Sequence, residues 1–161
     1  MLFRSSWGSS GPKVLLVGDS HAAQWFPALY ELAQAKKITL TSATKSSCPL
    51  TADTIYASGR TDISCDKWHI NILDLINKHN FDYIVFSAFD RNNYDIKGKD
   101  WGIGVAKFID QIASKGQIVQ LIDTPKPSGD SVACLSIYQK SPQKCDFAPQ
   151  NPIKIVNPKI K

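Results

Sequence analysis

Short apolar runs in this chain alternate with stretches in which apolar residues recur at helical spacing. The run at residues 13–17 is rich in branched side chains and ends at Gly18. Such a run is typical of a strand that is buried on both faces of a parallel sheet. Further strands are predicted from similar runs at residues 38–41, 81–87, 117–122 and 153–156.

Helices are predicted between these strands. Residues 22–35 carry apolar side chains at helical spacing, and Pro27 falls near the first turn, where proline costs least. Two more helices are predicted at residues 68–78 and 101–114, and the second of these stops before Gly116. This alternation predicts an α/β fold, a three-layer α/β/α sandwich with a parallel, flavodoxin-like sheet.

Length and composition fit one globular domain, which we predict over residues 13–161. The 161 residues are 43% hydrophobic and 20% charged, which argues against disorder. Residues 1–12 are expected to be a linker or an arbitrary start, and they lack the apolar stretch of a signal peptide. No apolar run approaches the roughly 18 residues that span a membrane. If the domain works outside the cytoplasm, an upstream segment must carry it there.

The net charge of +5 comes from scattered lysines. This pattern is typical of a solvated surface, and it gives no indication of nucleic-acid binding.

The four cysteines are Cys48, Cys65, Cys134 and Cys145. They form no Cys-x-x-Cys pair, so neither a zinc ribbon nor a thioredoxin-type site is indicated, and no metal site is predicted. An even count is consistent with two disulfides in any of three connectivities, or with four free thiols in a cytosolic protein. We favour Cys48 with Cys65 and Cys134 with Cys145, because each pair closes a short loop. Two disulfides would place the domain in an oxidising compartment.

The candidate chemistry lies in the tetrapeptide Gly-Asp-Ser-His at residues 18–21, between the first strand and the first helix. In open α/β sheets, ligands bind at the carboxyl ends of the strands. A serine at a helix start lies beside exposed backbone N–H groups, which favour the negative charge of an acyl-transfer intermediate. The alternative is that Asp19 and Ser20 only cap the helix.

Residues 14–23, with the sequence VLLVGDSHAA, resemble the first block of SGNH hydrolases. In particular, the chain resembles the SGNH domain fused behind membrane-embedded acyltransferase-3 proteins, which O-acylate cell-surface polysaccharides. Later segments at residues 45–49, 81–88 and 116–125, together with both cysteine pairs, resemble that subgroup in the same order. The resemblance covers about residues 13–149.

The resemblance implies that Ser20 is the nucleophile and that its backbone N–H donates to the oxyanion, with no cofactor and no metal. Asp19 and His21 are then expected to line the substrate pocket. In the wider family a Gly and an Asn complete the oxyanion hole. No clear Gly-x-Asn block is present here, so Asn92 and Asn93 are the nearby candidates.

The family's catalytic base comes from an Asp-x-x-His block in a late loop, and this sequence has no histidine after His79 that could belong to such a block. A serine without a base is a poor nucleophile, so the chain is expected to be either a truncated piece or an inactive relative, and we favour truncation. The three histidines do not replace the base. His21 adjoins Ser20, His69 is expected at the surface or boundary of a helix, and His79 is expected as a cation at that helix's end.

The leading hypothesis is serine-dependent acyl transfer or ester hydrolysis on O-acyl groups, such as acetyl groups, of cell-envelope polysaccharide. The domain would work in the periplasm or at the cell surface, tethered through a membrane acyltransferase domain outside this chain. The alternative is a catalytically inactive carbohydrate-binding or partner module on the same fold, which the missing base favours. A flavodoxin-like nucleotide or phosphate binder would need a loop richer in glycine than residues 18–21.

Overall fold

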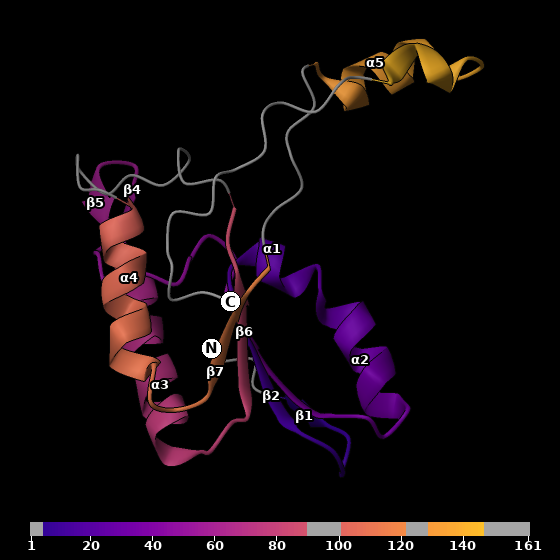
Figure 1. Ribbon diagram of the computed structural model, residues 1–161. Helices are drawn as coiled ribbons and strands as arrows, with labels where there is room; N and C mark the ends of the chain where they lie inside the picture. The colour runs from indigo at the N-terminus through magenta and orange to yellow at the C-terminus, as the bar shows by residue number, and fades with distance from the viewer. Residues whose placement is uncertain (1–4, 90–100, 122–128, 147–161) are drawn as a thin grey trace. The chain divides into compact units, whose positions relative to one another are not determined.

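The computed structural model describes residues 5–89, 101–121 and 129–146, and Figure 1 shows their secondary structure. The chain divides into two compact units. Unit 1 comprises residues 1–123 with 159–161, and unit 2 comprises residues 124–158. Unit 1 contains the sheet, and the described part of unit 2 is a short disulfide-linked helical segment.

Unit 1 is built on a five-stranded sheet in the order β1-β3-β2-β6-β7. Its strands are β1 (Ser5–Trp7), β2 (Lys13–Gly18), β3 (Thr39–Thr44), β6 (Tyr83–Ser87) and β7 (Gln117–Gln120). The pairings of β2 with β3, of β2 with β6 and of β6 with β7 are parallel. The predicted α/β fold is therefore confirmed, and the strand predicted at residues 153–156 lies outside the described residues.

Helices cover both faces of this sheet (Figure 1). They are α1 (Ser20–Ala23), α2 (Phe26–Gln34), α3 (Ile63–Lys78) and α4 (Trp101–Ile112). Side chains alternate along β2, so Leu15 and Val17 pack into the core under α3 and α4. Val14 and Leu16 face the other way, into the core under α1 and α2. The sheet is thus buried on both faces, which explains its continuous apolar runs.

The single helix predicted at residues 22–35 is broken into α1 and α2. The break falls just before Pro27, which lies in the first turn of α2. Proline has no N–H to donate, and its ring collides with the carbonyl four residues earlier, here that of Ala23, the last residue of α1. Between the two helices, the Trp25 N–H donates a hydrogen bond to the Ala22 carbonyl at 3.0 Å, which forms a single turn there.

Residues 5–7 form an edge strand, although they lie in the segment expected to be a linker. β1 pairs antiparallel with β3, so the sheet is mixed where an all-parallel sheet was predicted. The Trp7 ring packs edge-on against the Phe26 ring of α2, with 4.8 Å between centroids. The strand is too short for its periodicity to be recognised, and it is held by contacts with residues far along the chain.

The long loop predicted at residues 42–64 contains regular structure. A hairpin of β4 (Tyr56–Ala57) and β5 (Arg60–Thr61) lies within it. α3 begins at Ile63, earlier than predicted, because the Asp62 carboxylate caps it. The Asp62 Oδ1 atom accepts the N–H groups of the next turn at 3.0 and 3.1 Å, which satisfies donors that a helix start leaves open.

The described part of unit 2 consists of α5 (Ser131–Ile137) and a 3-10 turn at Pro142–Cys145. The Asp130 carboxylate caps α5 by accepting the Ala133 N–H at 2.9 Å. The Cys134–Cys145 disulfide joins the two elements, as predicted. No residue of α5 is buried. Among the described helices of the whole chain, none is long and apolar enough to cross a membrane.

Candidate active site

Ser20 is the first residue of α1 and lies directly beyond the carboxyl end of β2. Its side chain is exposed, whereas residues 14–19 before it are buried. Gly18 makes the turn with a φ of 138°, which side-chain-bearing residues rarely adopt. A Cβ atom at Gly18 would collide with the Ser87 carbonyl and would lie 2.8 Å from the Ala22 Cβ. The turn that presents Ser20 is therefore packed against both β6 and α1.

Asp19 lies beneath this turn and is fully buried, with 0% of its surface exposed. Its Oδ1 atom accepts the His21 N–H at 2.8 Å and so caps α1. Its Oδ2 atom accepts the Phe89 N–H at 2.7 Å, just past the end of β6. The sequence suggested that Asp19 lines a substrate pocket. In the structure its carboxylate links the Ser20 turn to the segment that follows β6, and a pocket-lining role for Asp19 stays a prediction.

His21 follows Ser20 and is half-buried. Its ring packs against the Phe89 ring, with 4.5 Å between centroids. The same two segments are therefore joined twice, by the Asp19 hydrogen bond and by this ring contact. Sequence reasoning missed Phe89, because nothing in the order of residues shows that it follows the strand next to β2.

The segment after β3 borders the Ser20 turn on its other side. β3 and β2 are parallel neighbours, and their carboxyl ends meet where Gly18 pairs with Thr44. The Lys45 N–H donates to the Gly18 carbonyl at 2.9 Å, which extends the pairing one residue beyond the sheet. The Cys48 N–H then donates to the Lys45 carbonyl at 3.1 Å and closes a turn over residues 45–48. This turn is therefore joined to Gly18, two residues before Ser20, on the β3 side.

A disulfide between Cys48 and Cys65 fixes this turn to the first part of α3, as predicted. Both cysteines are fully buried. Two disulfides are thus present, and none of the four cysteines is free.

His69 is buried, with 8% of its surface exposed, so the prediction of a surface or boundary position was wrong. Its ring packs against the Phe108 ring of α4, with 5.9 Å between centroids. Its Nε2 atom lies 2.7 Å from the Pro49 carbonyl oxygen, which can only accept, so Nε2 carries the proton. Burial lowers the pKa of His69, and this outweighs the opposing effects of the Pro49 hydrogen bond and of the Asp66 charge.

His79 is the C-cap residue of α3, and its N–H donates to the Leu75 carbonyl at 3.1 Å. Its position at the end of the helix agrees with the prediction. Asn92 and Asn93, the candidates for the oxyanion hole, lie outside the described residues.

Within the described residues, one group of potential metal ligands comes together, formed by Cys48, Cys65 and His69. Both sulfur atoms are held in the disulfide, so they are not available as thiolate ligands.

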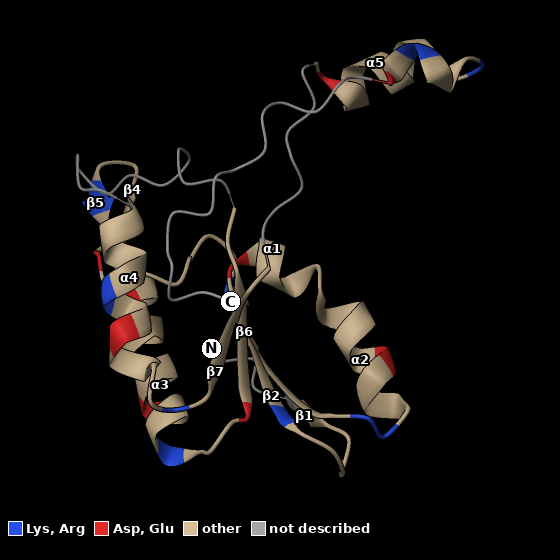
Figure 2. Cartoon of the chain, in the orientation of Figure 1, with Lys and Arg blue, Asp and Glu red and all other residues tan. Residues whose placement is uncertain are grey.

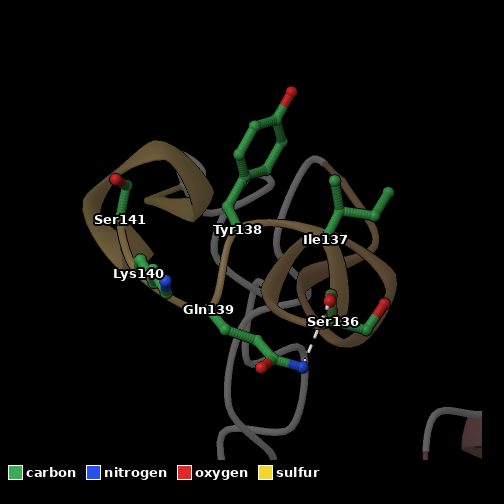
Figure 3. Close-up of a pocket in the computed structure, with 6 residues that line it drawn as sticks. All are labelled: Ser136, Ile137, Tyr138, Gln139, Lys140 and Ser141. Carbon is green, nitrogen blue, oxygen red and sulfur yellow. Dashed lines mark hydrogen bonds between the residues drawn. The ribbon is translucent and has the colours of Figure 1, made fainter.

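A shallow pocket occurs in unit 2, lined by residues 136–141, with Ile137 and Tyr138 projecting from it (Figure 3). It belongs to a different unit from Ser20. On the described elements, acidic and basic residues are interspersed, with no large region of one sign (Figure 2).

Comparisons with known proteins bear on this site. Residues 3–153 match the family model described as SGNH domain (fused to AT3 domains), which confirms the resemblance seen in the sequence. A solved structure, the periplasmic domain of the lipopolysaccharide acetyltransferase of Salmonella ser. Paratyphi A, shares the fold with a TM-score of 0.65 at 16% identity. The match covers 87% of this chain and 54% of that one, so the chain spans about half of that structure. No curated protein matches the chain.

Proposed function

Because this chain belongs to the family of SGNH domains fused to AT3 domains, we propose that it carries out Ser20-dependent acyl transfer or ester hydrolysis on O-acyl groups of cell-envelope polysaccharide. A general acyl-transferring or hydrolysing role agrees with the family and with the acetyltransferase domain that shares the fold. The observation that carries the proposal is the position of Ser20, exposed at a helix start on the carboxyl edge of a parallel sheet.

The proposed reaction has two steps. The Ser20 Oγ atom bonds to the carbonyl carbon of the ester, and its proton passes to a general base. The Ser20 backbone N–H donates to the oxygen that becomes negative. The leaving group, which is the sugar oxygen in hydrolysis and belongs to the acyl donor in transfer, then departs with the proton from the base. A second hydroxyl, from water or from an acceptor sugar, attacks the carbonyl carbon of the Ser20 ester and gives its proton to the base. The bond to the Ser20 Oγ atom breaks, the acyl group leaves on the new oxygen, and Oγ takes the proton back from the base. We assign the general base to no residue of this chain.

The proposed setting is outside the cytoplasm. Two disulfides form and persist in oxidising compartments, and the solved domain of the same fold is periplasmic. The family description supports a membrane acyltransferase domain as the partner that would deliver the acyl group. Acetyl is the acyl group that the name of the structural neighbour indicates.

A second candidate function is binding without catalysis, as a carbohydrate-binding or partner module. The observation that favours it is the cap of α1, in which the buried Asp19 carboxylate accepts the His21 N–H at 2.8 Å. In this case Ser20 and Asp19 would serve only as the start of α1.

Hydrolysis of a small aryl acetate separates the two functions. The chain is assayed beside Ser20→Ala and beside a version extended by its native downstream sequence, with and without the same substitution. Ser114→Ala is the matched control, because Ser114 is also exposed but lies between the end of α4 and the start of β7, at the opposite edge of the sheet. Turnover that is lost in Ser20→Ala and kept in Ser114→Ala supports the proposal. If every version is inactive while polysaccharide is still bound, the binding module is supported instead.

A further inference from the structure

A continuous series of contacts leads from the interior of α3 to the Ser20 turn. The His69 Nε2–H group donates to the Pro49 carbonyl at 2.7 Å. Pro49 follows Cys48, whose N–H closes the turn onto the Lys45 carbonyl. The Lys45 N–H in turn donates to the carbonyl of Gly18, two residues before the nucleophile. The side chain of the buried histidine is thus connected to the candidate site through the backbone of residues 45–49.

Residues 48 and 49 are held to α3 at two points that lie close together. One is covalent, the Cys48–Cys65 disulfide. The other is the hydrogen bond of His69, whose Nε2 atom lies 3.8 Å from the Cys48 Sγ and 3.9 Å from the Cys65 Sγ. A single covalent link still allows rotation about its bonds, whereas a second contact beside it removes that freedom. The histidine therefore adds an orientation that the disulfide alone does not define.

We propose that His69 is a positioning residue, which orients the turn at residues 45–48 beside Ser20 through its hydrogen bond to Pro49. The proposal rests on the proposed function, because the turn matters for turnover only if Ser20 is the nucleophile. His69 touches neither the substrate nor Ser20 in this account. Its role is to keep one wall of the site in the geometry that acyl transfer requires, where small displacements reduce the rate strongly.

The surroundings of His69 support this role. The His69 ring contacts the rings of Trp68 and Phe108, with 5.4 and 5.9 Å between centroids, and the residue is nearly enclosed. Burial of a polar ring is unfavourable unless its N–H has a partner, and the Pro49 carbonyl is that partner. An apolar side chain would fill the same space without this requirement, so the donor is the distinctive property of the residue.

The test compares variants that differ in this donor. His69→Phe keeps a ring and removes the N–H, whereas His69→Gln retains an N–H donor. His69→Met removes the donor with a flexible side chain, and it replaces the phenylalanine variant if that variant does not fold. Ile76→Val is the control, because Ile76 is fully buried on the same helix, two turns further from the disulfide. Each variant is assayed well below its unfolding temperature.

Two measurements are made on each variant. Deuterium exchange of the Lys45 and Cys48 amides reports the order of the turn, and Ser20-dependent hydrolysis of an aryl acetate, in the version of the chain that shows it, reports function. We expect His69→Phe to exchange faster at these amides and to lose about tenfold or more in kcat. We expect His69→Gln to restore both, and Ile76→Val to change neither.

Unchanged exchange in the donor-free variants would overturn the proposal, because the turn would then not depend on His69. Faster exchange with unchanged kcat would also overturn it, since the turn would then not matter to the site. If wild-type protein shows no Ser20-dependent turnover in any version, the proposed function fails first, and the positioning role fails with it. The exchange data show which of these failures has occurred.

Discussion

The carboxylate of Asp19 accepts the backbone N–H of Phe89 at 2.7 Å, across 70 positions of the chain. Both residues lie just past the carboxyl ends of adjacent parallel strands, β2 and β6. The same carboxylate caps α1 through the His21 N–H. One buried charged group thus sets the start of the helix that presents Ser20 and fixes the segment beside it. Its loss is expected to affect both features together.

Asp19→Asn is therefore expected to destabilise unit 1. An amide has one oxygen acceptor, so one of the two backbone N–H groups would face an NH2 group instead. Loss of a hydrogen bond to a buried charged group costs about 2 kcal/mol. The free energy of unfolding in urea measures this change. Asp74→Asn is the control, because Asp74 forms an exposed pair with Lys78 on α3, and such pairs contribute little. Equal effects of the two substitutions would contradict the role assigned to Asp19.

Much of this fold could be predicted from sequence because its signals are local. Strands β2 and β6 are continuous apolar runs, and burial on both sheet faces requires such runs. The turn at residues 18–21 follows from its glycine and from its position between a strand and a helix. Both disulfides follow from the short spacing of each cysteine pair.

The features that sequence analysis missed depend on contacts between distant segments. His69 looked like an ordinary polar residue on a helix, but the loop carrying Cys48 and Pro49 covers it. β1 has too few residues to show a period, and it is defined by its pairing with β3. The break before α2 is a different case, because Pro27 was visible in the sequence and its effect on the preceding turn was underestimated.

Gly104→Ala is expected to destabilise unit 1, although alanine normally favours a helix over glycine. A Cβ atom at this position of α4 would collide with the Thr51 hydroxyl and the Asp53 carboxylate. The Gly104 carbonyl also accepts the Ala52 N–H at 3.0 Å, so the loop cannot move away without losing this bond. Overpacking of this kind costs about 1–3 kcal/mol, against roughly 1 kcal/mol gained from helix propensity. Thermal unfolding measures the sign, and a more stable variant would show that the loop adjusts freely.

The two disulfides are expected to differ in what they stabilise. α5 has no buried residues, so Cys134→Ser with Cys145→Ser should abolish helical order in unit 2 and leave the unfolding of unit 1 nearly unchanged. Cys48→Ser with Cys65→Ser should destabilise unit 1, by about 3 kcal/mol for a loop of this length. Deuterium exchange of each unit, with urea unfolding of the whole chain, distinguishes these outcomes. Loss of order in unit 1 after Cys134 and Cys145 are replaced would contradict this assignment.

Acidification is expected to destabilise unit 1 through His69. Burial lowers the pKa of this histidine below its usual 6.5 in the folded state, so the unfolded chain binds a proton that the folded chain excludes. Stability is therefore fully present above pH 6.5 and falls as the pH drops below it, by at most about 1.4 kcal/mol per pH unit for one proton. The lowered pKa of Asp62 acts only below its usual 3.8, outside this range. The free energy of unfolding, measured between pH 7 and pH 5, should decline in wild type and decline less in His69→Gln. Parallel curves for the two proteins would mean that another group takes up the proton.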